Sequence, residues 1–223
     1  MLAAPILIGS CAPTQCTPAP PEAPPSTEPP PTTAPPAPPP PTAPPVAPQW
    51  SFLVTLPGGG YTRWDPCDDP ITFEIDAPDS SQEVVIRDAL ATAAVATGFQ
   101  FQEVASGGEA VIGLKDFPDG TLGEGGGNFN RTTGEMTSGV AYVDVGLKDL
   151  TLRYALLHEI GHMVGLGHVA SAAEVMYTFA VSPPKQQYAG GDLEGLRLVG
   201  TTMPCFPTEA LRVASPEQTV IVH

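Results

Sequence analysis

The stretch 158-HEIGHMVGLGH-168 places three of the chain's four histidines within eleven residues. On a helix, His158 and His162 are four positions apart and project from the same face. A continued helix would turn His168 to nearly the opposite side. We therefore expect the helix to break after His162. Gly165 is the residue at which a break is least costly, because glycine adopts positive φ without strain.

Three converging imidazoles suit a catalytic zinc ion, which binds neutral histidine nitrogens and keeps one position for water. We assign His158, His162 and His168 as metal ligands for one zinc ion. Glu159 stands beside the first ligand, where it can accept a proton from a zinc-bound water and return it to a leaving amine. The alternative is a zinc site that is only structural or has lost activity. Glu159 argues against it, because such a site has no use for a general base there.

The residues that flank this stretch alternate between strand and helix patterns. Alternating or short apolar runs predict strands at residues 70–76, 99–104, 110–114 and 140–145. Helical periodicity is found in residues 84–97 and 192–199 and in the histidine stretch itself. Residues 119–130 are rich in glycine and predict a loop. This order of elements predicts an α+β fold, an α/β sandwich around one twisted sheet.

Polar residues mark where the predicted helices begin and end. Ser80 and Ser81 can cap the first helix, and Gly98 closes it. Asp149 or Thr151 can cap the helix that carries the histidines. The cap residues of both predicted helices agree with the periodic patterns that they flank.

The N-terminal part differs in composition from the rest of the chain. Proline makes up about half of residues 12–48, so we interpret residues 12–49 as a disordered linker that favours extended polyproline II. Residues 1–11 resemble the tail of a secretory signal, and the segment 8–11 resembles a bacterial lipobox, which makes Cys11 a candidate for lipidation. We expect a folded domain at 50–213, a tail at 214–223, and an exported protein that is secreted or anchored at the cell surface as a lipoprotein.

The chain is acidic, with 9 Lys+Arg against 24 Asp+Glu and a formal charge of −15 at pH 7. Such a surface repels phosphate backbones, so we expect no nucleic-acid partner. No segment has 18 or more consecutive apolar residues, so no transmembrane helix is expected. The scattered carboxylates make calcium a second candidate cation, although no EF-hand-type loop is present to place it. We expect a monomer.

Cys67 and Cys205 bracket the folded domain. In an oxidising compartment they can pair and tie the beginning of the domain to its end. The alternative is two unpaired buried thiols.

The histidine stretch resembles the signature of the metzincin zinc endopeptidases at His158, Glu159, His162, Gly165 and His168. The second mark of that clan is a methionine turn beneath the metal. Met176, in the sequence Glu174–Tyr177, lies eight residues after His168, a short span that is similar to the matrixin branch. An ordinary core methionine is the alternative for Met176.

The matrixin resemblance implies a catalytic domain with a twisted mixed sheet, an active-site helix, the Met-turn and a C-terminal helix at 192–200. It also implies protein or peptide substrates, which bind in extended form beside an edge strand. We place part of that rim at residues 121–129, and the wall of the substrate pocket at the segment after Met176, through Pro183.

The chain departs from the family pattern at several positions. The fourth histidine is His223, so a second, structural zinc site is not expected. Val169 follows the third ligand, where matrixins have serine. We do not assign an oxyanion role to Tyr177. The leading hypothesis is a zinc-dependent endopeptidase, and the alternatives are a catalytically silent surface protein that binds other proteins and a narrow peptidase that processes one partner.

Overall fold

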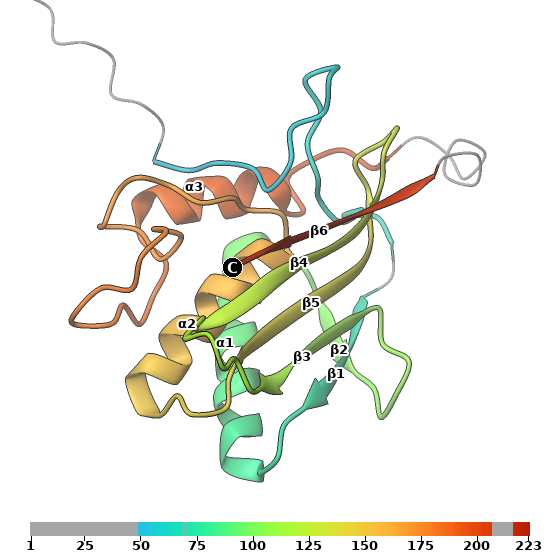
Figure 1. The fold of residues 1–223 in the computed structure, drawn as a ribbon. Helices are drawn as coiled ribbons and strands as arrows, with labels where there is room; N and C mark the ends of the chain where they lie inside the picture. The colour runs from blue at the N-terminus through green and yellow to red at the C-terminus, as the bar shows by residue number, and fades with distance from the viewer. Residues whose placement is uncertain (1–48, 69, 207–215) are drawn as a thin grey trace, which may run out of the picture. The chain divides into compact units, whose positions relative to one another are not determined.

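The computed structural model describes residues 49–68, 70–206 and 216–223 (Figure 1). The signal-like segment, Cys11 and the proline-rich linker up to residue 48 lie outside the described residues, so their assignments stay predictions.

The described strands form one mixed sheet in the order β2-β1-β3-β5-β4-β6. Their bounds are β1 Ile71–Asp76, β2 Phe101–Glu103, β3 Ala110–Lys115, β4 Gly123–Asn130, β5 Met136–Asp144 and β6 Glu217–Val222. Strands β1, β2, β3 and β5 run parallel. Strand β4 is antiparallel to β5, and β6 is antiparallel to β4. The sheet is therefore parallel on one side and antiparallel on the side that carries the site.

Three helices are described: α1 (Ser80–Thr97), α2 (Asp149–Met163) and α3 (Gly190–Val199). Helices α1 and α2 lie behind the sheet in the view of Figure 1. Leu156, Leu157 and Ile160 of α2 are fully buried and join one core with Ile112 of the sheet. The predicted α+β sandwich is confirmed.

The helix caps differ from those predicted. Helix α1 begins at Ser80 because Asp79 is its N-cap: the carboxylate accepts the backbone N–H of Ser81 (2.9 Å) and of Gln82 (3.1 Å). Ser80 and Ser81 therefore do not cap it, whereas Gly98 ends the helix in the left-handed conformation as predicted (φ 80°).

Helix α2 also lacks its predicted cap. Lys148 occupies the N-cap position without a side-chain hydrogen bond, so neither Asp149 nor Thr151 plays that role. The helix is nevertheless held, because its residues from Tyr154 to Met163 are buried by the core around them.

The prediction of a loop at residues 119–130 was wrong over most of its length, because Gly123–Asn130 is strand β4. Glycine is a weak strand former, and here tertiary packing overrides that preference. A Cβ on Gly125 would lie 2.5 Å from the carbonyl oxygen of Glu159, so only glycine lets the strand approach α2 this closely. Strand β6, Glu217–Val222, lies within the segment 214–223 that was expected to be a tail, and it joins the same sheet.

Candidate metal centre

Helix α2 presents two of the three predicted ligands. His158 and His162 lie one turn apart on its buried face, and their exposed fractions are 8 % and 0 %. The helix ends at Met163, directly after the second ligand.

A tight turn brings the third ligand back. Gly165 has φ 113°, and a Cβ there would lie 2.5 Å from the Thr62 carbonyl oxygen. The turn is held by hydrogen bonds from the Gly165 N–H to His162 O (3.0 Å) and from the Leu166 N–H to Gly161 O (2.9 Å). The break that the sequence placed at Gly165 is therefore present, and it redirects the chain toward His168.

The three imidazoles converge on one point. The Nε2 atoms of His158 and His162 are 3.1 Å apart, those of His158 and His168 are 3.1 Å apart, and those of His162 and His168 are 3.2 Å apart. Three nitrogens arranged tetrahedrally at about 2.05 Å from one ion would lie about 3.3 Å apart. The spacing therefore fits a single zinc ion.

Backbone carbonyls select the ring nitrogen that faces this point. His158 Nδ1–H donates to Val175 O (2.8 Å), and His162 Nδ1–H donates to Leu166 O (2.8 Å). A carbonyl oxygen only accepts, so these rings carry their proton on Nδ1 and turn the Nε2 lone pairs inward. Lone pairs at this distance repel each other, and a shared cation removes that repulsion.

Burial keeps the ligands in the neutral form that binds metal. It lowers the pKa of His158 to about 4 and that of His162 well below its usual range, and it also lowers the pKa of His168. All three rings are therefore neutral near pH 7, and no proton has to leave them when a cation binds.

Glu159 is buried beside the histidines, with an exposed fraction of 4 %. Its Oε2 atom has no hydrogen-bond partner. Burial, with a smaller contribution from the charge of Glu124, raises the pKa of Glu159 well above its usual range. A cation beside Glu159 would lower this pKa. An unpaired carboxylate oxygen at this place is thus available to a water molecule rather than to the protein.

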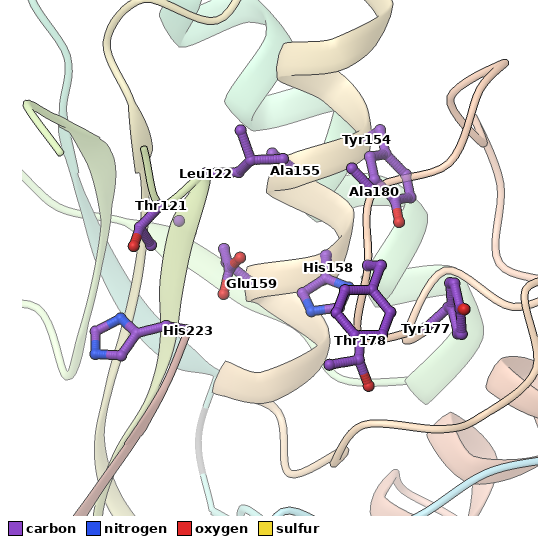
Figure 2. Close-up of a pocket in the computed structure, with 12 residues that line it drawn as sticks. Thr121, Leu122, Tyr154, Ala155, His158, Glu159, Tyr177, Thr178, Ala180 and His223 are labelled. Atoms are coloured by element: carbon purple, nitrogen blue, oxygen red, sulfur yellow. The ribbon is translucent and has the colours of Figure 1, made fainter. Parts of the chain in front are cut away.

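A cavity of about 270 Å³ opens on one side of His158 and Glu159 (Figure 2). Helix α2 forms one wall with Tyr154 and Ala155. Residues 177–180 form a second wall, and residues 121–123 a third, and both lie in segments that the sequence analysis expected to flank the substrate. His223 also lines this cavity, which the sequence did not predict.

Met176 is buried, with an exposed fraction of 1 %. A Cβ on Gly161 would lie 2.3 Å from its Sδ atom, so the methionine packs directly on the backbone of α2. The Val169 N–H donates to Met176 O (2.9 Å), which ties the turn to the residue after the third ligand. The assignment of Met176 to a Met-turn stays a prediction.

Two buried acids that the sequence analysis missed hold this turn. Asp192 of α3 accepts the N–H of Val175 (2.6 Å) and of Met176 (3.3 Å). Glu174 in turn accepts the Asp192 N–H (2.9 Å). The sequence placed Asp192 in the first turn of a helix, where acidic residues are common, but no local pattern pairs it with a segment 16 residues away.

Cys67 and Cys205 form a disulfide across 138 residues of sequence, so the predicted pairing is present. The Arg63 guanidinium donates to Pro204 O (2.7 Å), and the Phe206 N–H donates to Asp65 (3.2 Å). The bridge and these bonds fasten the start of the domain to the segment that follows α3.

This α+β fold, with three histidines around one point and a buried methionine packed on the backbone of α2, defines a metzincin catalytic domain. The sequence model of the matrixin peptidases matches residues 64–198, and the chain belongs to the matrixin family. A comparison with curated proteins finds no match. Matrixins are zinc-dependent metallopeptidases, which agrees with the three-histidine cluster. Within the part of the chain that the structure describes, no helix has the length and apolarity that a membrane span requires.

Proposed function

We propose that the protein is a zinc-dependent endopeptidase that hydrolyses peptide bonds in proteins. The observation that carries this proposal is the placement of Glu159, a buried carboxylate with an unpaired oxygen next to a metal ligand and at the wall of a cavity. His158, His162 and His168 would hold the ion. A zinc ion there would polarise the substrate carbonyl and would make water acidic enough to attack near neutral pH.

The protein's own residues would then move the proton. Glu159 accepts it from the attacking water, whose oxygen forms a bond to the carbonyl carbon. When the C–N bond breaks, Glu159 delivers the same proton to the leaving nitrogen.

We also propose that the domain works outside the cytoplasm, where it would meet protein and peptide substrates. The Cys67–Cys205 disulfide supports an oxidising compartment. The signal-like segment 1–11 and the linker 12–49 fit this location, and lipidation at Cys11 would anchor the domain at the cell surface.

The variant Glu159→Gln tests the proposal. It keeps the shape of the side chain and removes the base, so cleavage of an unbiased peptide library should fall by about two to four orders of magnitude while zinc remains bound. Turnover is read by mass spectrometry of the peptides, and zinc by elemental analysis with and without a chelator.

Glu194→Gln is the matched control, because Glu194 is an exposed glutamate on α3 and its substitution should leave both quantities unchanged. If wild-type protein and Glu159→Gln bind zinc equally and neither cleaves any peptide, the domain is a catalytically silent binding protein.

A further inference from the structure

Strand β6 occupies the edge of the sheet beside the metal centre. It pairs with β4 from Asn130↔Glu217 to Gly125↔Val222, with the two strands antiparallel (Figure 1). An extended peptide that joined this sheet through its backbone would need the same edge of β4. The position of β6 therefore bears directly on access to the site, an argument that rests on the proposed peptidase function.

Strand β4 is the wall of the metal centre, so whatever pairs with it lies close to the reacting groups. A Cβ on Gly123 would meet Glu159 Oε1 at 2.6 Å, and one on Gly125 would meet the Cβ of His162 at 2.8 Å. Strand β6 runs toward this end of β4, and the next residue, His223, lines the same cavity as Glu159 (Figure 2).

Strand β6 is held by its backbone pairing with β4 and by the packing of Val220 against the core. Its residues are exposed except for Val220 and Val222, which are half-buried. Two exposed side-chain hydrogen bonds add to the pairing: Thr219 Oγ1 donates to Asn128 Oδ1 (2.5 Å), and Glu217 Oε1 accepts from Thr137 Oγ1 (2.7 Å). A strand held in this way can be exchanged for another strand, because the incoming backbone restores the same hydrogen bonds.

The sequence of β6 resembles a peptide ligand for such an edge. Thr219–Val222 consists of four consecutive β-branched residues, the strongest class of strand formers. Glu217 and Gln218, which precede them in the strand, are exposed.

We infer that β6 is an autoinhibitory strand that occupies the peptide-binding edge of β4 and is displaced by an extended peptide substrate. The chain would then exist in a closed form, with β6 on β4, and an open form that binds substrate. The measured affinity for substrate is reduced by the open fraction.

Removal of residues 217–223 tests this inference. If about a tenth of the molecules are open, the deletion should lower KM for a peptide substrate about tenfold and leave kcat unchanged. An unchanged KM would overturn the inference. A loss of cleavage in a folded deletion variant, judged by circular dichroism, would also overturn it and would make β6 part of the substrate platform.

A binding measurement separates this inference from the proposed catalysis. A fluorescent peptide with the sequence of residues 217–223 should bind the deletion variant, measured by anisotropy, at least about tenfold more tightly than it binds the full chain. This difference in peptide binding is expected even if neither protein cleaves a substrate. Equal binding to both would contradict the autoinhibitory role.

A second variant keeps β6 in place. Asn128 and Thr219 face each other in the pairing, so Asn128→Cys with Thr219→Cys can form a bridge across the two strands. The oxidised form should neither bind the peptide nor cleave substrate, and reduction should restore both. Wild-type protein under the same reductant is the control, because Cys67–Cys205 is also reducible. Full binding by the oxidised double variant would overturn the inference.

Discussion

Asp192 is the residue that joins the segment of Val175 and Met176 to α3. One carboxylate accepts backbone N–H groups from Val175 and Met176 and also that of Ala189 (3.2 Å), and it is 1 % exposed. The Val175 carbonyl in turn accepts His158 Nδ1–H. Asp192 therefore positions His158, a predicted metal ligand, through one intervening peptide.

The same carboxylate predicts how stability depends on pH. Burial, the largest influence, raises the pKa of Asp192 to about 6, although three N–H donors act against it. The folded protein thus holds a proton that the unfolded chain releases near pH 4. Protonated Asp192 therefore contributes about 3 kcal/mol to the free energy of unfolding below about pH 4. This contribution is lost as the pH rises through about 6. Urea unfolding of metal-free protein between pH 3.5 and 7.5, compared with Asp192→Asn, should show this difference. If the unfolding free energies of the two proteins differ by the same amount at every pH, the prediction is wrong.

At the scale of elements, the contact between β4 and α2 decides whether the ligands are held in place. In Gly125→Ala, the new Cβ would meet backbone of Glu159 at 2.5 Å, and neither element can yield without moving the centre. We expect a loss of about 1–3 kcal/mol in unfolding free energy and weaker zinc binding. Gly58→Ala is the control, because no atom lies within 4 Å of that Cβ. Thermal denaturation measures the loss of stability, and competition with a zinc-binding dye measures the loss of zinc affinity. Equal stability and equal zinc affinity of the two variants would contradict the prediction.

The elements also show what the sequence could and could not predict. The histidine helix, its break at Gly165 and the last helix follow from local spacing and backbone preference, and these features agree with the structure. Strands β4 and β6 could not be predicted in this way, because their strand character comes from partners distant in sequence. Gly123–Asn130 has a loop-like composition, and its glycines serve close packing on α2 rather than a turn.

At the scale of the molecule, Cys67 and Cys205 link two segments that lie outside the strands of the sheet. The residues before β1 and those after α3 meet at Cys67–Cys205, where Arg63 and Asp65 add hydrogen bonds to the chain on either side of Cys205. The sequence suggested this closure only from the positions of the cysteines. The pairing required the neighbouring segments to converge, which no local pattern encodes.

This closure should dominate the stability of the whole domain. The bridge spans 138 residues, and a loop of that length limits the unfolded chain enough to stabilise the fold by about 4–5 kcal/mol. We expect Cys67→Ser with Cys205→Ser to lose most of that amount in urea unfolding and to keep its zinc content while folded. Cys11 and Cys16 should be serine in both proteins, so that no thiol exchanges with the bridge. If the double variant unfolds at the same urea concentration as its parent, the hydrogen bonds of Arg63 and Asp65 suffice to close the domain and the disulfide is dispensable.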